Sequence, residues 1–332
     1  MKIPMVVPAL VTLGAVLCAG PAPAQAQAPL KKITFLTNYT FHGRHSPFFV
    51  GLDKGYYRDA GFDIEISPAT GSGFVITAVD SGKADYGMAE AGPVVQAVAK
   101  GAKVKSFMVF TDISTSGLAS LKPYKTLESL KGQRIAASQT DSARVILPIL
   151  LERNKMAADS VQWLASDPGV YSSLLLSGQT DLFTASIDGD VPALEKVAGP
   201  RGKTVHFASF ADWGYDVFGY FLVASNESLA KDPDTARRFA QAIRKSVLYA
   251  VANPEETARI MVKYNPALNY DTTLAQWRQS IKSIDTAYVK KNGYGVATDE
   301  RLKSTIDLIE RALKLDAKLA PADIYTPVLQ PN

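Results

Sequence analysis

Residues 32–66 read KITFLTNYTFHGRHSPFFVGLDKGYYRDAGFDIEI, and their spacing indicates a strand, a helix and a second strand. Residues 32–37 predict a short strand, and residues 62–66 alternate apolar and acidic side chains, as a half-buried strand does. Between them, Ser46 is a favourable N-cap, Pro47 suits the first helical position, and Gly55 ends the helix. The stretch therefore predicts the strand–helix–strand unit of a parallel α/β sheet.

The same alternation continues along the chain and then restarts near residue 118. This restart predicts an α/β fold with two doubly wound lobes and a ligand cleft between them. We expect the chain to cross between the lobes at 111–116 and again at 210–220. The predicted boundaries are a signal peptide at 1–26, lobe 1 at 27–115 and 220–298, lobe 2 at 116–219, and a C-terminal helix and tail at 299–332.

The first residues have the pattern of a secretory signal peptide. One lysine precedes an apolar run, and small residues follow it, which predicts cleavage after Ala26 and a location in the periplasm. The run is shorter than the roughly 20 residues that span a bilayer. Leu17 stands before Cys18, where a lipoprotein needs a small residue, so we do not expect a lipid anchor. Cys18 is the only cysteine, and the mature chain is therefore expected to lack thiol chemistry.

Composition and motifs argue against several other classes of function. The chain has 47% hydrophobic and 20% charged residues and a net charge of +4, which is typical of a globular protein without a nucleic-acid footprint. His42 and His45 could begin a metal site, but His206 is the only other histidine. The segment around Ser72 matches neither the nucleophile elbow of hydrolases nor a dinucleotide fingerprint. We therefore expect no metal, no cofactor and no nucleic-acid partner.

Ligands of open α/β sheets bind at the carboxyl ends of the strands, so the residues there are the candidate site. They combine small hydroxyls, carboxylates, aromatic rings and basic groups, which together suit a flat ring with several polar edges. Two alternatives are open for the acids: Glu90 could cap the following helix, and Asp188 could be a turn former. Arg144 lies in the first turn of a helix, where it could bind an anion or pair with Asp141.

Several segments resemble a known family. Residues 45–57, 61–64, 82–87, 97–102 and 129–135 are similar to the periplasmic binding proteins that serve importers of thiamine pyrimidine precursors, riboflavin and alkanesulfonates. The resemblance implies a type II periplasmic-binding-protein architecture whose lobes close on a solute, with an ABC permease and its cytoplasmic ATPase as partners. It also implies that His45 contacts the ligand and that Trp213 is an aromatic wall. Relatives that make the pyrimidine carry a cysteine-rich motif, which the mature chain lacks, and this argues against an enzyme.

These observations leave three hypotheses. The first is a receptor for a small ring compound such as a pyrimidine. The second is a receptor for a sulfonate, nitrate or aromatic carboxylate, which Arg44 and Arg144 favour and which Glu90 and Asp188 oppose. The third is an exported enzyme. The predicted ligand-binding residues are Asn38, Tyr39, His45, Thr70, Ser72, Glu90, Ser138, Thr140, Arg144, Asp188 and Trp213.

Overall fold

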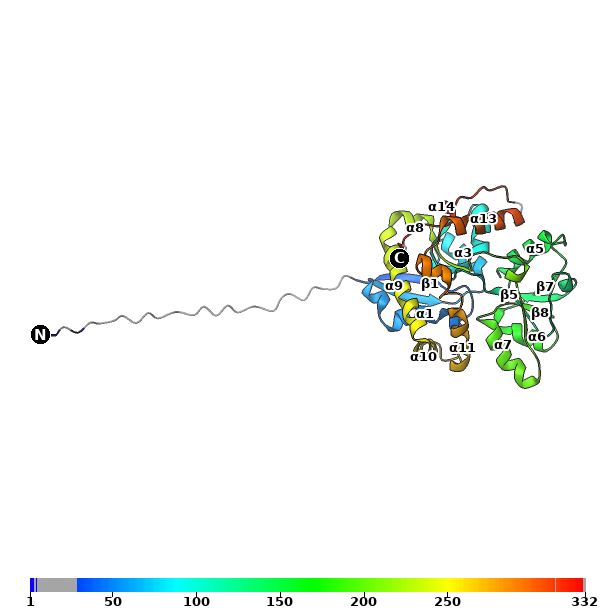
Figure 1. Cartoon of the computed structure of the whole chain (residues 1–332), viewed down its shortest axis with the longest axis horizontal. Helices are drawn as coiled ribbons and strands as arrows, with labels where there is room; N and C mark the ends of the chain where they lie inside the picture. Colours follow the sequence, from blue (N-terminus) through cyan, green and yellow to red (C-terminus); the bar gives the residue numbers. More distant parts are fainter. Residues whose placement is uncertain (3, 5–28, 314, 331–332) are drawn as a thin grey trace.

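The computed structural model describes residues 1, 2, 4, 29–313 and 315–330. The predicted signal peptide falls almost wholly outside this range. The described chain forms two α/β lobes that lie side by side, as Figure 1 shows with strands β1 and β5 in neighbouring halves of the molecule. The prediction of two α/β lobes is thus confirmed.

The sheet of the first lobe has five strands in the order β2-β1-β3-β10-β4. Strand β1 runs parallel to β2 and β3, with Ile33 opposite Ile64 and Phe35 opposite Tyr86. Strand β10 runs antiparallel to both β3 and β4. The strands are β1 (Lys31–Leu36), β2 (Phe62–Ser67), β3 (Tyr86–Glu90), β4 (Val104–Val109) and β10 (Tyr220–Ser225).

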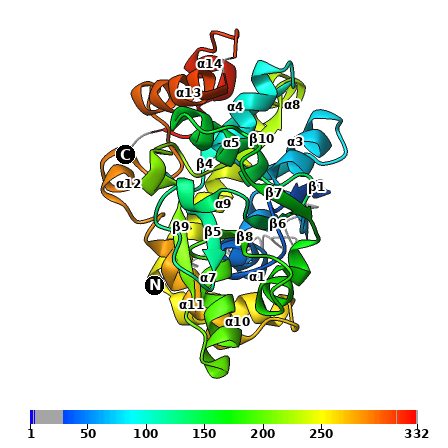
Figure 2. The same cartoon turned by 90° about the vertical axis from the view of Figure 1, so that its right-hand side faces the viewer.

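The second lobe repeats this plan in the order β7-β6-β8-β5-β9. Strand β6 is parallel to β7 and β8, whereas β5 is antiparallel to β8 and β9. This lobe faces the viewer in Figure 2. Its strands are β5 (Ser116–Ser120), β6 (Arg134–Ala137), β7 (Gln162–Ala165), β8 (Leu182–Ser186) and β9 (His206–Ser209).

The antiparallel strands β5 and β10 correct the expectation of purely parallel sheets. Each is the first strand after a crossing: the chain leaves the first sheet after Val109 and enters the second at Ser116, then leaves it after Ser209 and returns at Tyr220. Parallel strands direct their carboxyl ends toward the cleft. A chain that arrives from the other lobe starts at the cleft and must run away from it, so its strand is antiparallel to its neighbours.

Helices surround both sheets. Helix α1 begins at Ser46, so the prediction of Ser46 as its N-cap is wrong: Ser46 is the first helical residue, and His45 is the N-cap. None of the described helices is long and apolar enough to cross a membrane. The helices are α1 (Ser46–Asp53), α2 (Tyr56–Asp59), α3 (Ser72–Asp80), α4 (Ala91–Ala99), α5 (Ala143–Arg153), α6 (Tyr171–Leu176), α7 (Asp190–Ala198), α8 (Asn226–Lys231), α9 (Pro233–Ala252), α10 (Pro254–Tyr264), α11 (Tyr270–Ile281), α12 (Ala287–Asn292), α13 (Asp299–Leu313) and α14 (Pro321–Ile324).

An aromatic cluster fills the core of the first lobe. Phe239 of α9 is fully buried and stacks on Tyr86 of β3 at a centroid distance of 4.7 Å, and Phe35 of β1 packs on Phe48 of α1 at the same distance. On the same helix as Phe239, Ala236, Ala240, Ile243 and Val247 are also buried. This core holds the carboxyl ends of β1 and β3 in fixed positions, and both strands contribute to the site.

The C-terminal segment ties the two lobes together. Helix α13 packs on α4 of the first lobe and on α5 of the second, and it lies at the top of Figure 2 with α14. In the tail, Ile324 is buried, and Tyr325 pairs with Ser106 of the edge strand β4. The tail therefore covers a sheet edge that would otherwise expose unpaired backbone groups.

Candidate functional site

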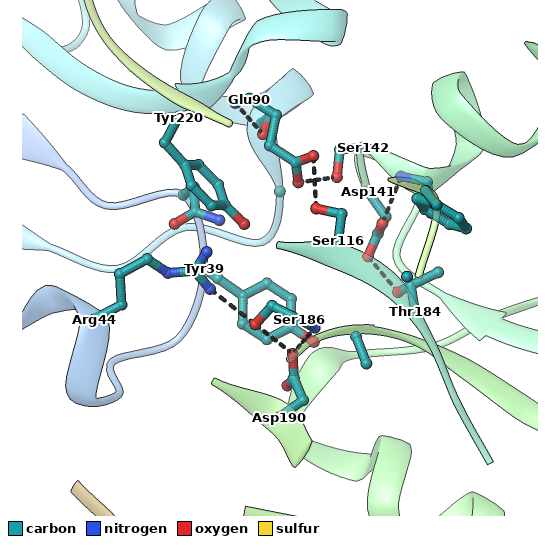
Figure 3. A pocket seen from close by; sticks show the side chains of 17 residues that line it. Tyr39, Arg44, Glu90, Ser116, Asp141, Ser142, Thr184, Ser186, Asp190 and Tyr220 are labelled. Atoms are coloured by element: carbon teal, nitrogen blue, oxygen red, sulfur yellow. Dashed lines mark hydrogen bonds between the residues drawn. The ribbon is translucent and has the colours of Figure 1, made fainter. Parts of the chain in front are cut away.

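A cavity of about 40 Å³ lies where the strand ends of the two lobes meet (Figure 3). The first lobe contributes residues that follow β1 and β2, the last residue of β3 and the start of β10. The second contributes the start of β5, the start of α5, the end of β8 and the start of α7. The lining residues are Asn38, Tyr39, Arg44, Gly71, Ser72, Glu90, Ser116, Gly117, Asp141, Ser142, Ala143, Thr184, Ala185, Ser186, Asp190, Phe210 and Tyr220.

Glu90, the last residue of β3, bridges the two lobes. Its carboxylate accepts hydrogen bonds from Ser116 Oγ at 2.8 Å and from Ser142 Oγ, both in the second lobe. Burial raises the pKa of Glu90 to about 7; Asp141 adds to this effect, and the two serines oppose it. The side chain makes no cap hydrogen bond to α4, so the capping alternative is wrong.

Arg44 is the only guanidinium of the lining and is fully buried. It donates to Thr115 Oγ1 at 3.2 Å and to Ser186 Oγ at 2.9 Å, and it lies 4.2 Å from the centre of the Tyr220 ring. Burial opposes its charge, but nearby acids led by Asp188 outweigh burial and raise its pKa. The positive charge of Arg44 is thus already balanced by acids of the protein.

Asp188 pairs with Arg44 rather than facing the cavity. The two side chains approach to 3.4 Å, and both are buried. Asp188 Oδ2 accepts from Ser280 Oγ of α11 at 2.8 Å, whereas Oδ1 receives no hydrogen bond among the described residues. The contact is therefore an ion pair without hydrogen-bond geometry. Asp188 thus does more than form a turn, because its side chain connects the second lobe to Arg44 and to α11 of the first lobe.

Two further carboxylates line the second lobe's side of the cavity. Asp141 accepts from Thr184 Oγ1 at 2.6 Å and from the backbone N–H of Ala143 at 2.9 Å. Asp190 accepts from the backbone N–H of Ser186 at 2.7 Å. Burial raises the pKa of Asp141, and it raises the pKa of Asp190 to about 6. With Glu90, the lining holds three carboxyl groups against one guanidinium that is already paired.

Four predicted site residues line the cavity: Asn38, Tyr39, Ser72 and Glu90. Ser72 also accepts the backbone N–H of Glu90 at 3.0 Å, which fixes the end of β3. His45 lies one layer behind, fully buried, with Nε2 at 3.1 Å from Asn38 Oδ1. His45 does not line the cavity, so the predicted direct contact with the ligand is not formed there. Its hydrogen bond to Asn38 connects it to the lining.

Three predicted hydroxyl residues lie at a contact between the lobes instead of in the cavity. Ser138 Oγ donates to the carbonyl of Thr70 at 2.5 Å, and Thr70 Oγ1 lies 3.3 Å from Thr140 Oγ1. Gly71 has φ of +152°, and a Cβ there would lie 2.2 Å from the Thr140 carbonyl oxygen. The backbones therefore approach so closely that only glycine fits.

The last two predicted residues support the lining from behind. Arg144 donates to the carbonyls of Ser138 at 2.6 Å and Ala137 at 3.1 Å, and it lies over Trp163. It therefore binds backbone rather than an anion in the cavity. Trp213 packs against Phe210 at a centroid distance of 6.2 Å, and Phe210 forms the aromatic wall in its place.

The predicted set lacks several lining residues. Those with functional side chains are Arg44, Ser116, Asp141, Ser142, Thr184, Ser186, Asp190, Phe210 and Tyr220. Thr184 and Ser186 lie at the carboxyl end of β8 and follow the same rule that identified Glu90. No group of three or more possible metal ligands occurs in the part of the chain that the structure describes.

Solved structures with this architecture identify the class of fold. The alkanesulfonate-binding protein SsuA of Xanthomonas axonopodis pv. citri, bound to MOPS, has a TM-score of 0.65 at 14% identity, over 90% of this chain and 99% of that chain. A Candida albicans protein described as having the generic periplasmic binding protein fold has a TM-score of 0.64 at 15% identity, over 92% and 98%. The chain has the periplasmic binding protein fold.

The chain belongs to the NMT1/THI5-like family, whose model matches residues 42–257. It is 26% identical over 281 residues to 4-amino-5-hydroxymethyl-2-methylpyrimidine phosphate synthase THI13 of Saccharomyces cerevisiae. That alignment covers 80% of this chain and 82% of the yeast protein. The predicted family resemblance is thus confirmed.

Proposed function

We propose that this protein is the periplasmic solute-binding subunit of an ABC importer and that its solute is a small nitrogen-containing aromatic ring with hydrogen-bond donors. The fold supports a receptor whose lobes close on a solute. The receptor would deliver the solute to a membrane permease driven by a cytoplasmic ATPase.

The charged residues that line the cavity are the observation on which the proposed ligand rests. Glu90, Asp141 and Asp190 line it, and the charge of Arg44 is compensated by Asp188. A sulfonate or nitrate would meet three acids and no free cation, and burying like charges together is costly. A ring that carries amino or N–H groups would instead satisfy the carboxylates, because these are acceptors.

Aromatic side chains supply the remaining surface. Tyr39, Phe210 and Tyr220 line the cavity and offer ring faces or edges to a flat solute. The cavity of about 40 Å³ is far below the roughly 300–1,000 Å³ of usual ligand pockets. A ring would therefore bind with the lobes further apart than they are here, which requires motion at the two crossings.

Proteins similar to this chain include both binding proteins and synthases, and we propose binding without turnover for this chain. Mass spectrometry of the solute released by denaturing the exported protein tests the proposal directly. The expected result is an unmodified nitrogen heterocycle in equal amount with the protein. Recovery of a sulfonate or nitrate would contradict the proposed ligand. Conversion of an added pyrimidine into a new product would contradict the receptor role.

A further inference from the structure

His45 is held in one orientation beneath the cavity. It is fully buried, and its ring contacts the rings of Phe41 and His42, at centroid distances of 6.3 and 4.3 Å. The backbone N–H of His42 points to His45 Nδ1 at 3.4 Å. On the opposite side of the ring, Nε2 lies 3.1 Å from Asn38 Oδ1.

These two contacts define the tautomer of the imidazole. A backbone N–H can only donate, so Nδ1 of His45 must accept, and the ring proton must lie on Nε2. The positively charged ring would have donors on both nitrogens and would oppose the His42 N–H. Burial, with His42 and Arg44 nearby, lowers the pKa of His45 well below its usual range, which agrees with a neutral ring.

The tautomer in turn orients Asn38. Because Nε2 of His45 donates, Asn38 must present its oxygen to His45, and its Nδ2 amide group points the other way. Asn38 is 6% exposed and lines the cavity. Among the described residues, no hydrogen bond from Asn38 Nδ2 to a protein acceptor is formed. The amide N–H groups are therefore available to a ligand.

We propose that His45 is a positioning residue that fixes the Asn38 amide as a hydrogen-bond donor to the solute. The proposal rests on the proposed function and makes it more specific: the solute must carry an acceptor for Asn38 as well as donors for Glu90, Asp141 or Asp190. An amino-substituted ring with a ring nitrogen has both groups. A site built to hydrogen-bond a polar group rejects the analogue that lacks it, because its own donor is left unpaired.

The experiment compares two probes that share a six-membered ring and an amino group. 4-Aminopyrimidine has ring acceptors, and aniline has none. By calorimetry, the wild type should prefer 4-aminopyrimidine by at least about tenfold. His45→Phe frees the Asn38 amide to rotate, so this preference should fall by about tenfold, and Asn38→Leu should reduce it equally. The double variant should lose no more than either single variant, because the two residues act through one hydrogen bond.

The control is His206→Phe, which changes a histidine of β9 that does not line the cavity and should keep the wild-type preference. An unchanged preference in His45→Phe, or additive losses in the double variant, would overturn the proposal.

A second measurement needs neither a variant nor a ligand. Long-range proton–nitrogen NMR spectra of the wild type should show His45 with its proton on Nε2, and a proton on Nδ1 would overturn the proposal. If neither probe bound, the proposed function would fail, whereas the NMR result would still decide the role of His45.

Discussion

Glu90 and Asp188 are two buried carboxylates at strand ends, yet they have opposite roles. Glu90 is 5% exposed and Asp188 is fully buried. Asp188 faces the guanidinium of Arg44 at 3.4 Å, whereas the partners of the Glu90 carboxylate among the described residues are the hydroxyls of Ser116 and Ser142. A partner charge inside the protein therefore makes a buried acid part of the scaffold. An acid without such a partner is available to a ligand.

The largest effect is expected for Asp188→Asn, which leaves the buried charge of Arg44 without its counter-charge. Breaking a buried ion pair in this way costs about 3–5 kcal/mol. Urea unfolding should show this loss, or small-angle scattering should show lobes that have opened so that water reaches Arg44. The double variant Arg44→Met, Asp188→Leu should recover most of the stability. Full stability in Asp188→Asn alone would contradict the scaffold role.

Glu90→Gln should change how stability depends on pH. The pKa of Glu90 is raised from 4.5 to about 7, so the folded protein holds this proton more tightly than the unfolded chain. Its contribution therefore favours folding at low pH and is lost as pH rises from about 4.5 through 7, by about 3 kcal/mol. Asp190, with a pKa of about 6, acts in the same direction.

Urea midpoints at pH 5 and pH 8 measure this prediction. Glu90→Gln should flatten the decrease that the wild type shows, and the exposed Glu128→Gln should leave it unchanged. A wild type whose stability rises across this range would show that the carboxylate has a partner charge after all.

A smaller effect is expected for Ser142→Ala. The variant removes one hydrogen bond to Glu90 across the lobes, which is worth about 1 kcal/mol. Because this hydrogen bond lowers the pKa of Glu90, its loss should move the decrease in stability to higher pH. The same pair of urea titrations, extended to pH 9, measures the shift. No shift would indicate that Ser142 does not bond the ionised carboxylate.

The smallest effect is expected at the contact between the lobes outside the cavity. Thr140→Val removes a hydroxyl that lies 3.3 Å from Thr70 Oγ1 at an exposed position, and such changes cost at most about 0.5 kcal/mol. Ligand affinity measured by calorimetry should be unchanged within twofold. A tenfold loss would place Thr140 in the site.

The sequence predicts the fold well because strand–helix alternation and turn residues are local signals. It misses β5 and β9, and it misses the antiparallel direction of β10, because that direction depends on where the chain crosses between lobes. The site residues also divide into those that local signals predict and those that depend on the tertiary structure. Glu90, Ser72, Asn38 and Tyr39 lie at carboxyl ends, where the general rule places ligands.

The residues that escape prediction do so for identifiable reasons. Ser116 and Tyr220 are the first residues of the antiparallel strands, so their amino ends meet the cleft, and a rule about carboxyl ends cannot find them. Asp188 and Asp190 are two positions apart. Asp188 pairs with the buried Arg44, whereas Asp190 accepts from Ser186 and lines the cavity. These partners are brought together only by the tertiary structure.

Calorimetry with the wild type and Glu90→Gln tests most directly whether the cavity is built for donors rather than anions. The two titrants are 4-amino-5-hydroxymethyl-2-methylpyrimidine and methanesulfonate. We predict that the wild type binds the pyrimidine and not the sulfonate, and that Glu90→Gln weakens the pyrimidine at least about tenfold, because a charge-assisted hydrogen bond becomes a neutral one. Tight binding of methanesulfonate, unchanged or improved by Glu90→Gln, would contradict this account.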